Sequence, residues 1–337
     1  MKTIKFIYLL VGCGLLVYVF SETDLKLLWS NLIKTGWGVF FVLLIYGFAF
    51  WVDTIAWQFT LPSTRFNWMY RLWKVRMVGA AFGKVLPFSA FGGAPIKGFL
   101  LKKHYGISYR EGAASIILIE STHLISMIIF MTSGVFLISL MPDFPKSYLT
   151  FSKISLGVLS LGIFGFYIVQ RYKLTSVIGN WFSQMAIGHR VKKFLSHIEE
   201  FDERLVHFYT LKRQLFFGAL GLNLLNWYLG AVEIYIILYF LGHPISIAES
   251  IILETFVEIV RAGTFFIPGT LGTQEAAFLL ATGAITGEPA LGVAAALMRR
   301  VREIIWFILG FSLGWQYSGN PSKIPQTAQN EMRNDKD

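Results

Sequence analysis

The sequence predicts an all-α integral membrane protein built as an inverted repeat, and three observations support this fold class. Hydrophobic residues make up 55% of the 337-residue chain, and its mean hydropathy is +0.57, values typical of a membrane protein. Two apolar stretches are interrupted by glycine and proline in a similar way. Lysine and arginine gather in alternate loops, which indicates how the spans are oriented.

Six full spans are expected, because a helix needs about 20 mainly apolar residues to cross the bilayer core. They lie near residues 4–20, 36–60, 111–140, 152–170, 214–240 and 289–315. The chain starts like a signal peptide, but no small-residue cleavage site follows, so residues 4–20 are expected to stay as a first span. The single cysteine, Cys13, excludes an intrachain disulfide and a cysteine metal site.

The more informative interruption lies in RAGTFFIPGTLGTQEAAFLL, residues 261–280. The apolar run is broken by Pro268, Gly269 and Gly272, and it then resumes with Gln274 and Glu275 inside it. Unpaired backbone groups cost several kcal/mol in hydrocarbon, so such a break persists only where protein buries it or it lines a wet cavity. Interrupted helices of this kind build the binding sites of transporters.

A second copy of this pattern occurs upstream in LPFSAFGGAPIKGFLL, residues 86–101. Aligning Gly93 with Gly272 places Phe99–Leu101 opposite Phe278–Leu280. After a one-residue gap the match continues, with Gly112 opposite Gly292, Glu120 opposite Arg300 and His123 opposite Glu303. The chain is therefore predicted to be a duplicated unit in which each half holds one interrupted, re-entrant hairpin, near residues 67–101 and 246–283.

The distribution of basic residues predicts that the two halves are inverted. Lysine and arginine flank the first hairpin and fill the interval 171–213, whereas the loops 21–35, 141–151 and 241–248 hold only three lysines. Both termini and residues 171–213 are therefore expected in the cytoplasm. The span at 36 then runs inward and its counterpart at 214 runs outward, so the two hairpins enter from opposite sides.

The domain organisation follows from the same count. Residues 1–317 are predicted to form one transmembrane domain, with repeat halves near 36–140 and 214–315, and 318–337 a disordered cytoplasmic tail. The amphipathic interval 171–213 is expected to lie on the cytoplasmic leaflet, and no interval is long enough for a soluble catalytic domain. The net charge of +10 lies beside the spans, which indicates contact with anionic headgroups and not nucleic acid.

Charged residues inside the predicted spans are the first candidates for a site, since they are costly in the bilayer. On the two helices around the second break they are Glu254, Glu258, Arg261, Arg299, Arg300, Arg302 and Glu303. One interpretation is structural ion pairing, with Arg299 and Glu303 as an i, i+4 pair. The other is an anion seat, which the sequence favours because one glutamate cannot pair all three arginines of the last helix.

The glycine breaks support the same anion seat. A half-helix that starts after the second break offers free N–H groups and a positive dipole end, and the first break offers the equivalent from the other side. The alternative interpretation is close helix packing. The predicted lipid-headgroup site comprises Gly92, Gly93, Lys97, Arg261, Pro268, Gly269, Gly272, Gln274, Glu275, Arg299 and Arg300.

A further set of residues could act as a proton relay or as ion pairs. Glu120 and His123 lie one helical turn apart, where a satisfied core pair is the alternative to a relay. The same two interpretations apply to Glu254, Glu258 and Glu303. Asp53 and Glu233 are expected to make helix-to-helix hydrogen bonds. No catalytic triad, HExxH motif or P-loop is present, and neither a metal nor a cofactor is expected.

Two segments carry a family resemblance. They are IPGTLGTQEAAFLL followed by AALMRRVREIIWFILG, and FGGAPIKGFLLKKHYGIS followed by ILIESTHLIS. With them the chain resembles the flippase-like family that includes the transmembrane part of lysylphosphatidylglycerol synthases, and it looks closest to the branch associated with hopanoid biosynthesis. The resemblance implies a multi-pass inner-membrane protein that moves or handles a lipid.

Two departures from the family pattern limit what carries over. Thr270 stands where the family's turn usually has a glycine, which makes the turn stiffer. The first half has Lys97 at the end of its motif but lacks the acid that usually accompanies it, so an acidic role there is not implied. The synthases of this family add a soluble aminoacyl-transfer domain, for which this sequence has no counterpart.

Three functions are consistent with these observations. The first is a lipid transporter that binds an anionic headgroup between its two hairpins. The second is a membrane-embedded lipid transferase with Glu258 or Glu275 as base, and the third is a non-transporting partner of hopanoid or phospholipid biosynthesis enzymes. The lipid could be an anionic phospholipid, a polyprenyl phosphate or a hopanoid-type lipid, and a homo-oligomer is left open.

Overall fold

The computed structural model describes residues 30, 33–61, 68–83, 93–142, 144–171, 212–264, 267, 270 and 272–319. These residues form α-helices joined by turns and contain no β-strand, which confirms the all-α prediction. The predicted first span at 4–20, the amphipathic stretch within 171–213 and the predicted tail from 320 onward lie outside the described residues.

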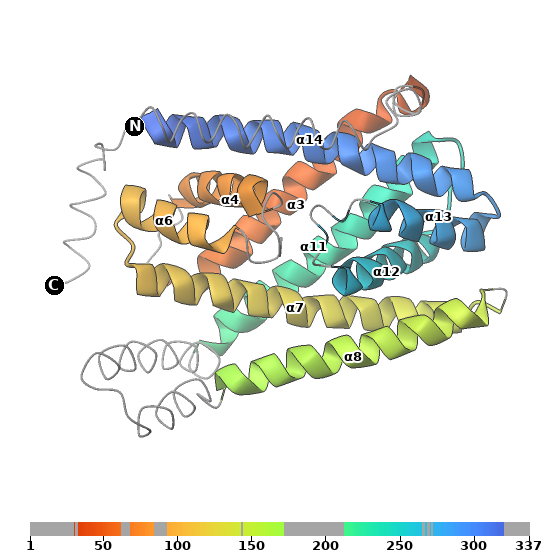
Figure 1. Cartoon of the computed structure of the whole chain (residues 1–337), viewed down its shortest axis with the longest axis horizontal. Helices are drawn as coiled ribbons and strands as arrows, with labels where there is room; N and C mark the ends of the chain where they lie inside the picture. The colour runs from red at the N-terminus through yellow and green to blue at the C-terminus, as the bar shows by residue number, and fades with distance from the viewer. Residues whose placement is uncertain are drawn as a thin grey trace.

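The described helices form two sets with the same order of lengths (Figure 1). The first set is α3 (Gly38–Thr60), α4 (Met69–Gly83), α6 (Ala94–Tyr105) and α7 (Tyr109–Ser139). The second set is α11 (Arg213–Phe240), α12 (Ile247–Gly263), α13 (Thr273–Thr286) and α14 (Pro289–Gly319). In the sequence, α8 (Lys146–Arg171) comes between the two sets. Each half therefore reads as a long helix, two short helices and a second long helix.

Four helices among the described residues, α3, α7, α8 and α11, are long and apolar enough to cross a membrane. They correspond to four of the six predicted spans, and they make the chain a membrane protein. Helix α14 has 31 residues, which is also enough, but its middle carries the charged sequence Arg299 to Glu303. Four of the predicted spans are thus confirmed in position, and the predicted span at 289–315 corresponds to a helix whose crossing of the membrane stays a prediction.

The four short helices occupy the two predicted hairpins. They have 15, 12, 17 and 14 residues, fewer than the roughly 20 that a helix needs to cross the bilayer core. The α4–α6 pair lies along one end of α7 and the α12–α13 pair along the other, with their interrupted ends directed towards the centre (Figure 1).

Local sequence signals set the ends of the helices in the same way in both halves. Helix α6 ends at Gly106 and α13 ends at Gly287, both in the left-handed conformation with φ of 71° and 74°. Glycine reaches that conformation without the steric penalty that a Cβ brings. The two short helices therefore end in the same turn, and a long helix of 31 residues follows each.

Contacts between the halves follow an antiparallel two-fold pattern. Helices α3 and α11 pack against each other. Gly38, at the start of α3, packs against the Phe240 ring at the end of α11, and Gly218, near the start of α11, packs against Phe59 near the end of α3. In addition α4 packs on α14 while α12 packs on α7, so the first short helix of each half contacts the last long helix of the other half. This arrangement agrees with the predicted inverted repeat.

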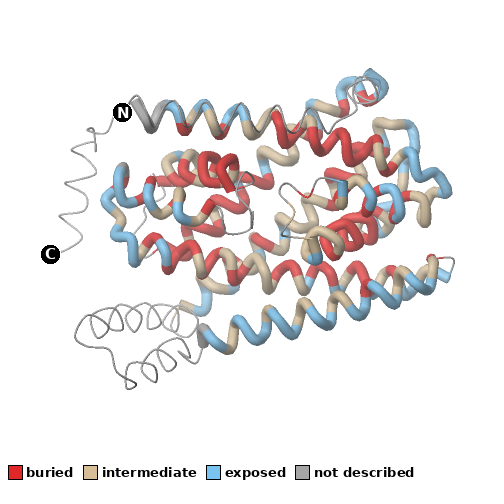
Figure 2. Tube along the Cα trace, in the orientation of Figure 1, coloured by how far each residue is buried: buried red, intermediate tan, exposed pale blue. Residues whose placement is uncertain are grey.

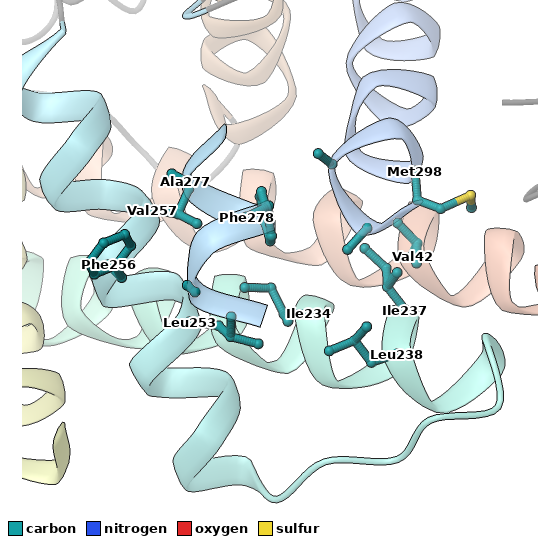
Figure 3. Packing of buried hydrophobic residues seen from close by; sticks show 13 residues of the cluster. Val42, Ile234, Ile237, Leu238, Leu253, Phe256, Val257, Ala277, Phe278 and Met298 are labelled. Carbon is teal, nitrogen blue, oxygen red and sulfur yellow. The ribbon is translucent and has the colours of Figure 1, made fainter. Parts of the chain in front are cut away.

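Each half has its own apolar core. In the second half, side chains from α11, α12, α13 and α14 meet, including Ile234, Leu253, Phe278 and Met298, and Val42 of α3 joins them (Figure 3). A separate cluster around Trp57 holds the first half together. Buried residues line the inside of the bundle, whereas α8 is exposed along most of its length (Figure 2).

Candidate functional site

A polar cavity of about 230 Å³ lies where the two halves meet, between α3, α7, α11, α12 and α14. Its charged lining residues are Glu233, Glu254, Glu258, Arg261, Arg299, Arg302 and Glu303. His123 and Tyr46 also line it. Most of these charged residues are buried, and the helices that carry them are otherwise mainly apolar. Charged groups in such a place are expensive unless they are paired, so their partners define the site.

Arg299 and Arg302 of α14 bind carboxylates from other helices. The Arg299 Nη2 atom donates to Glu254 Oε2 over 2.6 Å and to the Gly230 carbonyl over 3.0 Å. Its Nε atom lies 3.7 Å from Glu233. Arg302 forms an ion pair with the same Glu233 of α11. Helix α14 is thus tied to α11 and α12 through buried charges.

Arg300 faces a different helix. Its Nε atom donates to Glu275 Oε1 over 2.8 Å, and its Nη1 atom donates to Glu303 Oε2 over 3.0 Å. Glu275 in turn accepts the Gly272 N–H over 2.9 Å, so it connects α14 to the first turn of α13. The predicted pairing of Arg299 with Glu303 is therefore corrected, because Glu303 bonds to Arg300 and lies 3.9 Å from Arg302.

Arg261 and Glu258 form an ion pair within α12. The Arg261 side chain is 31% exposed, whereas those of Arg299 and Arg302 are 3% and 9% exposed. Glu258 is itself buried, with 7% of its side chain exposed. Arg261 is therefore the most accessible of the three guanidinium groups that line the cavity.

The charged residues of the first half form a second group. The Lys97 Nζ atom lies 3.3 Å from Glu120 Oε1, and Arg76 of α4 pairs with Asp53 of α3. Glu120 was predicted to associate with His123, but its ion pair is with Lys97. His123 instead lines the cavity, and its ring stacks on Trp227 with centroids 4.7 Å apart.

Aromatic rings of α3 connect the two groups of charges. The Arg302 guanidinium lies 3.9 Å from the centre of the Tyr46 ring. Tyr46 contacts Phe50, and the Arg76 guanidinium lies 5.4 Å from the centre of the Phe50 ring. Cations are attracted to the faces of aromatic rings, and the attraction strengthens where water is excluded. The buried charges of both halves therefore meet along one face of α3.

The structure divides the predicted site residues into three groups. Those that line the cavity are His123, Glu254, Glu258, Arg261, Arg299 and Glu303. Those described elsewhere are Gly93, Lys97, Glu120, Gly272, Gln274, Glu275 and Arg300, of which the last two adjoin the cavity through Glu303. Gly92, Pro268 and Gly269 lie outside the described residues.

Three residues of the site were missed or misassigned. Arg76 belongs to the basic residues that are expected to flank the first hairpin, but it lies within α4 and pairs with Asp53. Glu233 was expected to make only a helix-to-helix hydrogen bond, yet it binds two arginines in the cavity wall. Tyr46 was not singled out. The signal that could have identified the first two is a buried acid without a local basic neighbour, which is Asp53 for Arg76 and Glu233 itself in the second case.

The N-terminus of α13 is the half-helix start that was predicted to offer free N–H groups to an anion. The Gly272 N–H donates to the chain's own Glu275, and Gln274 is buried within the same first turn. Among the residues that the structure describes, no group of three or more histidines, cysteines and acids is placed to hold a metal ion. The paired guanidinium groups can exchange ionic partners, passing from a carboxylate to a ligand of similar geometry.

Comparison with known proteins defines the class of this fold and site. The family model described as the lysylphosphatidylglycerol synthase TM region matches residues 5–311. The chain therefore belongs to this family and is a membrane protein of lipid metabolism or transport. No curated protein and no solved structure matches the chain. The more specific resemblance to the hopanoid-associated branch stays a prediction.

Proposed function

We propose that this protein binds the phosphate-bearing headgroup of an anionic lipid in the charged cavity and passes it between the two leaflets. The observation that carries this proposal is the cavity itself, which residues of both halves line and in which the second half places three guanidinium groups. Intramembrane charges at the junction of two inverted halves are typical of transporter binding sites.

The size of the cavity supports a headgroup as the bound part. Its volume of about 230 Å³ is below the roughly 300–1,000 Å³ of pockets that enclose drug-sized ligands. A whole lipid therefore does not fit, and its tails stay in the bilayer. Phosphate matches the planar donor set of arginine as well as a carboxylate does, so it can replace a glutamate at Arg261 or Arg299.

The two pairs of short helices supply a route for the headgroup. We infer that each pair is re-entrant, one from the cytoplasmic side and one from the outside, and that movement of one half against the other opens the cavity to each leaflet in turn. Under this proposal the protein lies in the inner membrane with both termini in the cytoplasm. A cysteine at Ser147 and one at Ser196 should then react with impermeant labels from opposite sides, and labelling from one side would contradict the inversion.

Purified full-length protein in liposomes tests the function directly. Labelled phosphatidylglycerol should move between leaflets without chemical change, and Arg299→Lys should slow this movement, because an ammonium cannot form the two parallel hydrogen bonds of a guanidinium. Lys212→Gln, in the turn before α11, serves as the control. A new lipid product would instead support a transferase in which Glu258 acts as base, and neither movement nor product would support a non-transporting partner.

A further inference from the structure

The cavity that the proposed function uses has unequal numbers of acids and bases. Its lining includes four carboxylates and three guanidinium groups. The carboxylates are Glu233, Glu254, Glu258 and Glu303, and the guanidinium groups are Arg261, Arg299 and Arg302. An incoming phosphate adds another negative charge to a place that is already short of one cation. Unpaired charges in a low-dielectric interior are strongly disfavoured, so the headgroup requires a compensating positive charge.

The four carboxylates differ in how they are held. Glu254 bonds to Arg299, which is 2% exposed, and Glu233 bonds to both Arg299 and Arg302. Glu303 lies between Arg300 at 3.0 Å and Arg302 at 3.9 Å. These three carboxylates are all bound by arginines from α14. Within the described part of the chain, Glu258 pairs with a single cation, Arg261, one turn further along its own helix.

That one cation is also the group that a headgroup reaches first. Arg261 is several times more exposed than Arg299 or Arg302, while Glu258 beside it is buried. A phosphate that takes Arg261 therefore separates it from Glu258 and leaves a buried carboxylate without its partner. A buried carboxylate in that position favours its protonated form, since burial penalises the charged one.

We propose that a proton is the co-ligand of the headgroup, and that Glu258 accepts it when the phosphate takes Arg261. This inference rests on the proposed function. No bond between heavy atoms changes: the Arg261–Glu258 ion pair is replaced by an Arg261–phosphate pair. One proton passes from hydronium or a buffer acid in the solvent to a Glu258 carboxylate oxygen, where it forms an O–H bond. The negative charge brought by the phosphate and the positive charge of the proton cancel. The charge of the cavity is thus the same before and after loading.

The groups that face Glu258 from each neighbouring element define the alternatives. They are Glu254 and Arg261 on α12 itself, Arg299, Arg302 and Glu303 on α14, Glu233 on α11 and His123 on α7. The other three acids keep their α14 arginines when Arg261 is taken. His123 stacks on Trp227, and within the described part of the chain it forms no ion pair with Arg261 that the phosphate would break. Glu258 is therefore the group whose environment changes most.

Calorimetry on the full chain in detergent micelles tests this coupling. Titration with dihexanoyl phosphatidylglycerol in two buffers of different ionisation enthalpy measures protons taken up per lipid bound. We expect about one proton, and an affinity that rises by about tenfold for each pH unit lowered in the range where Glu258 titrates. Glu258→Gln should bind the lipid with little proton uptake and a flat pH profile. Glu288→Gln, at an exposed acid before α14, should behave like the unmodified protein. His123→Gln should keep the proton uptake, whatever it does to the affinity.

The outcomes separate this inference from the function on which it rests. Lipid binding without proton uptake, uptake that survives in Glu258→Gln, or uptake lost in His123→Gln would each overturn the coupling while leaving headgroup binding intact. Absence of lipid binding to the unmodified protein would overturn both proposals. If Glu258→Gln does not fold, the two-buffer measurement on the unmodified protein still decides the question.

Discussion

The two interrupted helix pairs place an ion pair at the same point of the fold with opposite polarity. In the first half the base is Lys97 on the short helix α6 and the acid is Glu120 on the long helix α7. In the second half the acid is Glu275 on α13 and the base is Arg300 on α14. Since the contact is present in both halves while the signs are exchanged, we infer that it ties each half-helix to its long neighbour. The sign of the charge is secondary to that contact.

Glycine also occurs at both breaks, but for a different structural reason in each half. Gly93 has an ordinary φ of −81°, but a Cβ there would collide with the Gly79 carbonyl of α4. Gly272 has a φ of +78° with open space around it. The first glycine permits a close approach of two backbones, and the second permits a left-handed turn. Equivalent positions in a repeat therefore do not have equivalent roles.

The largest difference between the halves concerns buried charge, and Arg299→Gln tests it. This change leaves Glu254 buried without its cation, so we expect unfolding to become easier by about 3–5 kcal/mol. Lys97→Gln should cost only about 1 kcal/mol, because the Glu120 side chain is 32% exposed and water can replace the lysine. Denaturant titration in detergent micelles compares the two variants.

The double variant Arg299→Gln with Glu254→Gln provides the control for that comparison. It removes both charges and should recover most of the lost stability, because neutral amides can bond to each other. Equal losses for Arg299→Gln and Lys97→Gln would show that the second half is no more dependent on its buried charges than the first.

Exchanging the charges within the Lys97–Glu120 and Glu275–Arg300 ion pairs tests the comparison further. Lys97→Glu and Glu120→Lys should each destabilise the protein by about 1–3 kcal/mol, and the double exchange should restore it. The same exchange at Glu275 and Arg300 should not be restored. Arg300 also bonds to Glu303, and Glu275 also accepts the Gly272 N–H. The coupling free energy from each double-mutant cycle is the measurement, and restoration in both halves would contradict the additional contacts.

Substitutions at the two break glycines are expected to have smaller effects than Arg299→Gln. Gly93→Ala should destabilise by about 1–3 kcal/mol, because the added methyl group meets backbone that cannot rotate away. Gly272→Asn should cost under about 1 kcal/mol, since asparagine tolerates positive φ better than other residues do. Gly272→Val should cost about 1–3 kcal/mol because its β-branched side chain does not.

Gly157 of α8 is the matched control for these glycine variants. It has no neighbouring atom within 4 Å of an added Cβ, so Gly157→Val should change stability by less than about 0.5 kcal/mol. Thermal unfolding and labelled-lipid binding on all four variants test the assignment. If Gly93→Ala is as mild as Gly157→Val, the close approach of α6 to α4 is wrong.

The sequence alone determined the layout of the helices. Apolar runs of sufficient length predicted the spans, because hydrocarbon favours continuous helix and penalises exposed backbone. The interruptions at Gly93 and Gly272 predicted where short helices begin, and the alignment placed Glu120 opposite Arg300. These properties depend on local composition and spacing, which a single chain displays directly. The partners of Glu120 and Arg300, which are Lys97 and Glu275, came from the structure.

Only the tertiary structure decided which charges meet. Arg299 has a glutamate four positions along its helix, yet it bonds to Glu254, which is 45 residues away on α12. Arg76 has a partner in Asp53 on another helix, and Glu233 binds two arginines of α14. An ion pair forms wherever packing brings opposite charges together out of water. Its partners are therefore set by how the two halves pack against each other, and sequence spacing does not record that packing.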